Sequence, residues 1–203
     1  MSDPCTEGIG NCTKTQRDIV KRAFQDASAM LARAQDALIA YEKKPAAPSN
    51  RKVVTALKKH FNWTEALMAS PSPGEVRVTP DYIPGKAREY IRTLMGKISV
   101  PFGAICPAND QQREQLNPQH KGDIVKILAA ALQDNTNCFM YTPDYFRQKP
   151  EFRAKVVLHE MFHSWKYMSD DSYEGDAKYP GKVGNATENP DSYACLIRDI
   201  GRR

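Results

Sequence analysis

The feature that most constrains this chain is a pair of histidines four residues apart, His159 and His163, which encloses a glutamate, Glu160. If the segment is helical, residues i and i+4 share one face, so both imidazoles can reach a single metal ion. Glu160 then lies beside a metal-bound water and can take its proton. The spacing therefore predicts a helix that carries a zinc-hydrolase centre, with Zn²⁺ as the cofactor.

The flanking residues favour a helix in this place. Pro150 suits a first helical position, and Glu151 complements the positive end of the helix dipole. Apolar side chains for packing are Phe152, Val156, Met161, Phe162 and Trp165. The alternative is a buried amphipathic helix whose histidines only satisfy hydrogen bonds. A buried glutamate between two histidines is unfavourable without a cation, so the metal interpretation is preferred.

The composition predicts one domain, residues 1–203, with room for a small second lobe. The chain has 203 residues, of which 41% are hydrophobic, enough for a real core. No apolar run is long enough to cross a bilayer, and no signal peptide is visible. The net charge of +5 is spread along the chain, which indicates a solvated basic face and not a nucleic-acid-binding surface. His60 and His120 lack ligand spacing and are expected to be surface or half-buried residues.

The five cysteines are too far apart for a CxxC metal site. Cys106 and Cys138 are a candidate disulfide pair, and the odd total leaves a thiol or an intermolecular bond. We therefore expect an oxidising destination. With no leader in view, we expect a protein secreted, or delivered outside the producing cell, as a trimmed protease or as an effector or toxin domain of a larger protein.

Hydrophobic periodicity predicts a mainly helical α+β domain with a small antiparallel sheet. Helices are expected at residues 13–44, 50–60 and 86–96, after Pro150, and from Asn189 onward. Residues 124–132 fit a helix or a buried strand, and the three alanines favour the helix. Strands are expected at 76–78 and 137–141, and loops at 101–119 and 169–188. The first helix opens with Thr13 and Gln16 at capping-box spacing. Residues 150–203 are expected to form the active-site part.

A catalytic zinc keeps three protein ligands and one open position, so a third ligand should follow His163. The candidates are Asp170, Asp171, Asp176, Glu188 and Asp191. No histidine follows at the short metzincin spacing. Glu188 would suit a thermolysin-like arrangement, although it precedes Pro190 and does not lie within a helix.

The motifs resemble those of the deuterolysin and peptidyl-lysine metalloendopeptidase family, the aspzincins. Residues 169–175, SDDSYEG, are similar to the family's Gly-Thr-x-x-Asp-x-x-Tyr-Gly loop without the Gly-Thr pair. Residues 189–194, NPDSYA, resemble its Asn-Ala-Asp-Ser-Tyr segment. Two further segments, 11–16 and 137–146, resemble the family's first helix and the strand before its active site.

The resemblance implies a zincin-like fold and a zinc endopeptidase acting on a protein or peptide. It implies Asp171 as the third ligand, or Asp170 if the Asp-x-x-Tyr spacing is kept, and Tyr173 as an oxyanion donor. Asp191 is a candidate substrate-binding residue, a ligand, or a residue that orients one. Lysine-specific relatives carry an acidic residue where this chain has Ala194, so strict lysine specificity is not expected.

Three alternatives stay open at this stage. The first is a thermolysin-like zincin that uses Glu188. The second is an inactive metal-binding interaction module, which the incomplete loop motif allows. The third is a basic nucleic-acid binder, whose association would depend strongly on salt. The substrate and the oligomeric state are not encoded in any visible pattern.

Overall fold

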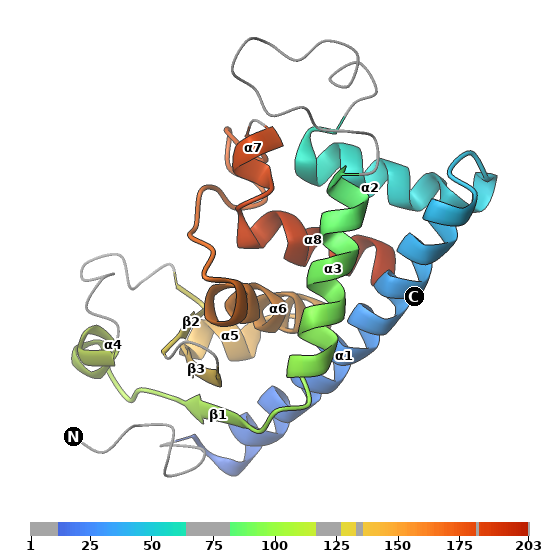
Figure 1. The fold of residues 1–203 in the computed structure, drawn as a ribbon. Helices are drawn as coiled ribbons and strands as arrows, with labels where there is room; N and C mark the ends of the chain where they lie inside the picture. The colour runs from blue at the N-terminus through green and yellow to red at the C-terminus, as the bar shows by residue number, and fades with distance from the viewer. Residues whose placement is uncertain (1–11, 64–81, 117–126, 133–135, 182, 203) are drawn as a thin grey trace. The chain divides into compact units, whose positions relative to one another are not determined.

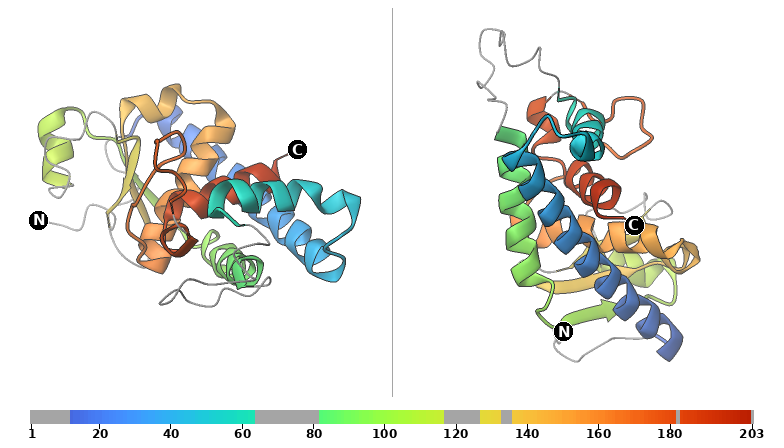
Figure 2. Two further views of the ribbon diagram at one scale, coloured as in Figure 1. Left: turned by 90° about the horizontal axis from the view of Figure 1, so that it is seen from above. Right: turned by 90° about the vertical axis from the view of Figure 1, so that its right-hand side faces the viewer.

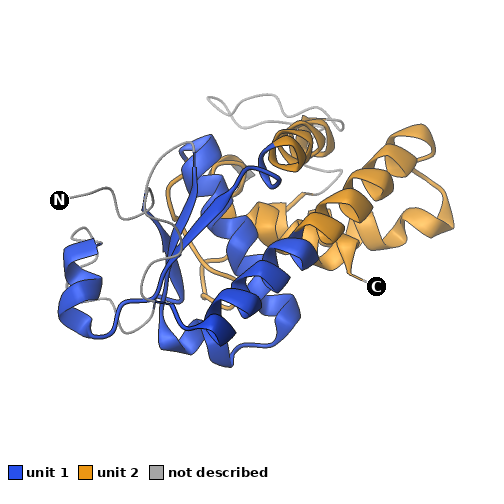
Figure 3. Cartoon of the chain, turned by 90° about the horizontal axis from the view of Figure 1, so that it is seen from below, with its two compact units in different colours: residues 1–27, 97–167 blue, residues 28–96, 168–203 orange. Residues whose placement is uncertain are grey.

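The computed structural model describes residues 12–63, 82–116, 127–132, 136–181 and 183–202. The chain divides into two compact units (Figure 3). Unit 1 comprises residues 1–27 and 97–167, and unit 2 comprises residues 28–96 and 168–203. Each unit is therefore built from two stretches that are distant in sequence, and each is described by itself below.

Helix α1, Lys14–Lys43, begins where the sequence predicts (Figure 1). The capping box is formed: the Thr13 N–H donates to Gln16 Oε1 at 2.9 Å, and the Gln16 N–H donates to Thr13 Oγ1 at 3.2 Å. Its buried face follows the helical period and consists of Val20, Ala23, Phe24, Ala27, Met30, Leu31, Ala34, Leu38 and Tyr41.

Unit 1 contains a three-stranded sheet with the order β1-β3-β2. The strands are β1 (Phe102–Ile105), β2 (Ala129–Ala131) and β3 (Asn137–Tyr141). β1 runs parallel to β3, and β2 runs antiparallel to it. The sheet is thus mixed, which corrects the antiparallel sheet that we expected. Every residue of the central strand β3 is buried.

Two sequence predictions in unit 1 were wrong. The segment 101–119, expected to be a loop, contains β1 and the helix α4, Asp110–Leu116. The described part of segment 124–132, expected to be a helix because of its alanines, contains β2. Both strands are short and exist because they pair with β3, so tertiary contacts override the local preference. The small alanine side chains also allow helix α6 to approach β2 closely.

Helix α6, Pro150–Lys166, packs on β2 and β3, and α5, Pro143–Arg147, precedes it. The buried Asn137 fixes the end of α6, because its Oδ1 accepts from Trp165 Nε1 at 2.9 Å. Its Nδ2 donates to the Lys97 and Val100 carbonyls. Ser164 Oγ donates to the Thr136 carbonyl at 2.6 Å. These polar contacts set the position of α6 along the sheet.

The described parts of unit 2 contain helices, joined by loops that include residues 168–181 (Figure 2). Besides the end of α1, it contains η1 (Pro48–Asn50), α2 (Arg51–Phe61), α3 (Tyr82–Lys97, except its last residue), α7 (Val183–Ala186) and α8 (Pro190–Gly201). α2 packs against α8, where the ring centroids of Phe61 and Tyr193 are 4.9 Å apart. A Cβ at Gly201 would lie within 3.1 Å of three Met30 backbone atoms, so α1 and α8 approach closely there.

The helices of unit 2 correct two details. His60, expected to be a surface or half-buried residue, has no exposed surface. The helix of 86–96 begins earlier, at Tyr82, and Pro84 is tolerated in its first turn. The predicted strand at 76–78 and His120 lie outside the described residues.

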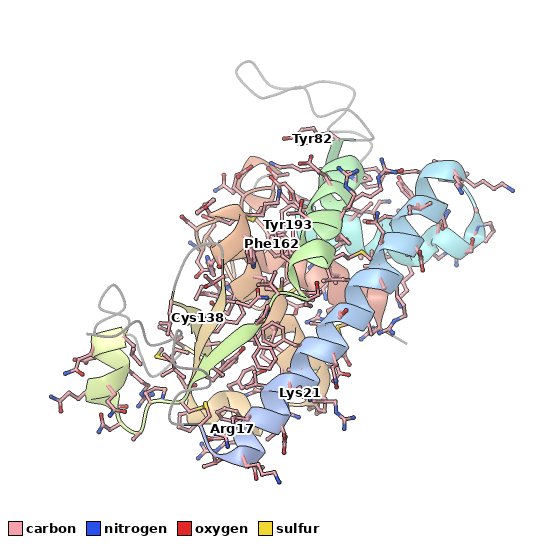
Figure 4. All side chains as sticks on the ribbon, turned by 60° about the horizontal axis from the view of Figure 1, so that its bottom comes forward. Arg17, Lys21, Tyr82, Cys138, Phe162 and Tyr193 are labelled. Atoms are coloured by element: carbon pink, nitrogen blue, oxygen red, sulfur yellow. A yellow bond between two sulfur atoms is a disulfide. The ribbon has the colours of Figure 1, made fainter. Side chains whose placement is uncertain are left out.

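Cys12 and Cys106 form a disulfide in unit 1, with their Cα atoms 4.8 Å apart. The expected pair Cys106–Cys138 was wrong. In the parallel register, Gly103 is opposite Cys138 and Ile105 is opposite Met140. Cys106 therefore lies three residues along the strand direction from the position opposite Cys138, about 10 Å, which is beyond the reach of a disulfide. Cys138, labelled on β3 in Figure 4, is itself disulfide-bonded.

The described chain is mostly helical with one small sheet, which confirms the α+β class. Among the described helices, none is both long enough and apolar enough to cross a membrane.

Candidate functional site

Helix α6 carries His159, Glu160 and His163. Pro150 occupies its first turn, preceded by Lys149 in extended conformation. Its core face has no exposed surface and consists of Ala154, Val157, Leu158, Met161 and Phe162, the last labelled in Figure 4. Burial of that face in unit 1 fixes the rotation of the helix, and hence the direction of both histidines.

The two imidazoles converge through the same ring atom. His159 Nε2 and His163 Nε2 are 3.0 Å apart, and the ring planes are inclined by 73°. Two nitrogens bound about 2.05 Å from a tetrahedral zinc lie roughly 3.3 Å apart. His159 is only 6% exposed and His163 is half-buried. The pair therefore has the chemistry and nearly the spacing of two zinc ligands.

Glu160 is 5% exposed and its carboxylate is held by the sheet. Its Oε2 accepts a hydrogen bond from the Ala131 N–H at 2.8 Å. Ala131 is the last residue of β2, which lies at one edge of the sheet. The helix and the edge strand thus orient Glu160 together, a contact that the sequence pattern did not reveal.

Helix α6 ends at Tyr167, which adopts the left-handed conformation with φ 55°. Its N–H donates to the His163 carbonyl at 3.1 Å. The chain then enters unit 2, where the candidate carboxylates Asp170, Asp171 and Asp176 lie in the loop 168–176. We call this segment the carboxylate loop.

Within unit 2, the candidate aspartates have different surroundings. Asp170 is exposed, and its Oδ2 accepts from the Tyr173 hydroxyl at 2.7 Å. Asp171 is half-buried, and its Oδ2 is 3.5 Å from the position that a Cβ at Gly181 would take. Asp176 Oδ2 accepts from the Tyr173 N–H at 2.8 Å. Asp176 is therefore engaged in turn formation, whereas Asp170 pairs with a side chain.

Asp191 and Asn189 lie at the start of α8, and neither has exposed surface. Asn189 caps the helix, since its Oδ1 accepts from the Asp191 N–H at 3.2 Å. Asp191 Oδ2 accepts from the Glu174 N–H at 2.7 Å and from Cys195 Sγ at 3.5 Å. Asp191 thus contacts the carboxylate loop from within unit 2, and its predicted substrate-binding role stays a prediction.

A second group of metal-ligating types, His60, Glu174 and Cys195, lies in unit 2 with its ligand atoms within 4.8 Å of one another. Both Glu174 oxygens already meet cations, at 2.6 and 3.0 Å from Arg198 and at 2.7 Å from Lys59. Hydrogen bonds from Arg198 lower the pKa of Glu174 to about 2, although burial opposes this shift. Two fixed cations disfavour a third, so this group does not suit a metal.

Both ring nitrogens of His60 face protein oxygens: Nδ1 lies 2.8 Å from Tyr179 Oη, and Nε2 lies 2.9 Å from Asp199 Oδ2. Burial alone would raise the pKa of Asp199, but hydrogen bonds from His60 and Arg198 lower it below its usual value. Burial raises the pKa of Tyr179. His60 is therefore a structural histidine of unit 2.

Glu188, the thermolysin-like alternative, lies in the turn before α8. Its Oε1 is 2.5 Å from Lys86 Nζ, and most of its side chain is exposed. Its partner among the described residues of unit 2 is thus a cationic side chain, which does not favour a role as a metal ligand.

Sequence reasoning missed the Ala131 contact to Glu160 and the role of Asn189 as a loop partner. The first depends on the pairing of β2 with β3, which no local pattern shows. The second had a signal, because an asparagine that caps a helix through its oxygen still has an amide NH₂ to donate.

The chain was compared with known families and proteins. No protein-family model matches it, and no curated protein matches it. The likeness to the aspzincins consequently rests on the residues of the two motifs themselves.

Proposed function

We propose that this protein is a zinc-dependent endopeptidase of aspzincin type. The observation that carries the proposal is the convergence of His159 Nε2 and His163 Nε2, which are 3.0 Å apart on a helix that also carries the buried Glu160. A buried acidic residue between two facing imidazoles fits a cation better than it fits an apolar core.

The proposed ligands are His159, His163 and Asp170. Asp170 is preferred over Asp171 because it keeps the Asp-x-x-Tyr spacing and its carboxylate accepts from the Tyr173 hydroxyl. Metal-binding carboxylates commonly have such a hydrogen-bond partner. The chain supports this assignment, because Asp170 comes only three positions after Tyr167, whose N–H donates to the His163 carbonyl. Three extended residues span about 10 Å, so the chain limits how far Asp170 can lie from the end of helix α6.

A zinc ion held by these ligands would lower the pKa of a bound water to about 7 and polarise the scissile carbonyl. Glu160 accepts the proton of the attacking water and passes it to the nitrogen of the leaving amine. The Ala131 N–H fixes the Glu160 carboxylate through Oε2, which preserves its orientation between the two transfers. The Tyr173 hydroxyl donates to Asp170 Oδ2 in this structure, and in the reaction it turns its one hydrogen from Asp170 to the developing oxyanion. The Tyr173 side chain is 47% exposed.

The sheet supports a substrate in extended conformation. β2 is an edge strand, and in the described residues no strand pairs with its outer side. The residue that ends β2, Ala131, is also the one that binds Glu160. A peptide that pairs with this edge would therefore lie beside the general base. The Cys12–Cys106 disulfide supports the further proposal that the protein works in an oxidising setting.

The test is zinc content together with cleavage of an unstructured protein such as casein, for the wild type and Glu160→Gln in parallel. We expect one zinc per chain in both, and a loss of about 10³-fold or more in the cleavage rate of the variant. Cleavage sites mapped by mass spectrometry then define the specificity. A wild-type protein without zinc, or a Glu160→Gln protein that cleaves as fast as the wild type, would refute the proposal.

A further inference from the structure

The peptide groups on either side of Tyr173 are bound by two buried side chains of unit 2. Asn189 Nδ2 donates to the Ser172 carbonyl at 2.7 Å, and Asp191 Oδ2 accepts from the Glu174 N–H at 2.7 Å. Neither Asn189 nor Asp191 has exposed surface. The two contacts bracket Tyr173 from the same helix start, and we call this arrangement the Tyr173 clamp.

Asp176 completes the fixation of the backbone. The Tyr173 N–H donates to Asp176 Oδ2 at 2.8 Å, and the Asp176 N–H donates to the Tyr173 carbonyl at 2.9 Å. In each of the two peptide groups next to Tyr173, both the carbonyl oxygen and the N–H therefore have a hydrogen-bond partner. The backbone of Tyr173 is thus constrained from both sides.

The side chain of Tyr173 contrasts with its backbone. It is 47% exposed, and its hydroxyl donates to Asp170 Oδ2 at 2.7 Å. Burying a carboxylate and an amide only to hold a surface loop is unfavourable unless the position of the loop matters. A rigid backbone under an open polar side chain is the arrangement expected of a group that acts on another molecule.

We propose that Asn189 and Asp191 are positioning residues that set the Tyr173 hydroxyl for transition-state stabilisation. The inference rests on the proposed function. Asp191 acts here through its hydrogen bond to the Glu174 N–H and not through its charge. Asn189 acts through Nδ2, while its Oδ1 serves the separate task of capping α8. These two side chains thereby connect the start of α8 to Tyr173, the residue proposed to contact the substrate.

The variants separate these roles. Asn189→Asp keeps the capping oxygen but removes the donor to Ser172. Asp191→Asn keeps an oxygen for the Glu174 N–H but removes the charge, whereas Asp191→Ala removes both. We expect Asn189→Asp and Asp191→Ala to lower kcat about 10- to 100-fold with KM changed less than about threefold, and zinc content to be kept. Asp191→Asn should rescue most of the loss seen in Asp191→Ala.

A double-mutant cycle with Tyr173→Phe distinguishes positioning from general damage. In the Tyr173→Phe background, Asn189→Asp should lower kcat by no more than about threefold further, because the group that it positions is gone. If the losses of kcat in Tyr173→Phe and Asn189→Asp multiplied in the double variant, the proposal would be overturned. So would an Asp191→Asn variant that loses as much kcat as Asp191→Ala and changes the preference for basic residues, since the carboxylate would then contact the substrate itself.

Amide hydrogen exchange measures whether the Tyr173 clamp is formed, and this measurement does not depend on catalysis. The Glu174 amide should be protected in the wild type and in Asp191→Asn, and should exchange at least tenfold faster in Asp191→Ala. If the wild type binds no zinc and cleaves nothing, the proposed function fails together with the catalytic role of the clamp. If the wild type cleaves but Asp191→Ala changes neither exchange nor kcat, the clamp proposal fails and the proposed function stands.

Discussion

Helix α6 and the carboxylate loop place their polar side chains by different physical means. In α6, the rotation of the helix is fixed by an apolar face that includes Val157, Met161 and Phe162, and the histidines follow from helical geometry. In the loop, the peptide groups on either side of Tyr173 are fixed by hydrogen bonds with the side chains of Asn189, Asp191 and Asp176. The first arrangement depends on burial and the second on polar side chains, so they should fail under different substitutions.

The largest effect should come from a comparison of two buried histidines, His159 of α6 and His60 of unit 2. His159→Ala removes a proposed zinc ligand, so zinc should be lost and the cleavage rate should fall about 10³-fold or more. His60→Ala leaves Tyr179 and Asp199 without their buried partner, so the unfolding free energy should fall by about 2–4 kcal/mol.

Metal analysis and chemical denaturation of both variants test this contrast. His60→Ala should keep one zinc per chain and the wild-type rate per folded molecule. A His159→Ala protein with full zinc content, or a His60→Ala protein that is folded but free of zinc, would reverse the assignment of the two histidines.

The next effect concerns the third ligand. Asp170→Ala should weaken zinc binding about 100-fold, because it removes the proposed charged ligand. Asp171→Ala should change the zinc affinity less than about threefold, since the Asp171 carboxylate is next to Gly181. Competition with a chromogenic chelator measures both constants. A larger loss in Asp171→Ala would make that residue the ligand instead, and a loss confined to Glu188→Ala would favour the thermolysin-like alternative.

The difference between helix α6 and the carboxylate loop also explains which features could be predicted from the sequence. The start of α6 at Pro150 and the pairing of Asn189 with Pro190 at the start of α8 follow from local patterns. The strands β1 and β2 could not be predicted, because their four and three residues gain their hydrogen bonds from β3.

The same limit applies to the charged residues of unit 2. Glu174 lies 115 residues from Lys59 and 24 from Arg198, and no spacing rule links such positions. His60 was expected at or near the surface because its neighbours in sequence are polar, whereas its partners, Tyr179 and Asp199, lie more than 100 residues away. Local spacing reveals side chains on one element, and it does not reveal networks between elements.

A smaller effect should appear in the pH dependence of stability. The folded-state pKa of Glu174, about 2, lies below its usual value of 4.5, chiefly through the Arg198 hydrogen bond. The ionised carboxylate therefore stabilises the folded state above about pH 4.5, and this contribution is lost as the pH falls toward 2. We expect Glu174→Gln to lower the unfolding free energy by about 1–3 kcal/mol at pH 7, with solvent screening included.

Urea denaturation of the wild type and Glu174→Gln at pH 7, 4 and 2.5 measures this difference. The gap between the two proteins should narrow over the acidic range. A constant gap would mean that the ion pairs of Glu174 with Arg198 and Lys59 contribute little to the stability.

The smallest effect compares two tyrosines without exposed surface, Tyr141 of unit 1 and Tyr193 of unit 2. The Tyr193 hydroxyl donates to the Thr187 carbonyl at 3.1 Å, so Tyr193→Phe should lower the unfolding free energy by about 1 kcal/mol. The Tyr141 hydroxyl has no hydrogen-bond partner among the described residues, and burial raises its pKa well above 10. Tyr141→Phe removes this unsatisfied group and should therefore leave the stability unchanged or raise it by up to about 1 kcal/mol. Thermal denaturation of the two variants measures this difference in stability. If Tyr141→Phe were as destabilised as Tyr193→Phe, the Tyr141 hydroxyl would have to bind a group beyond the described residues.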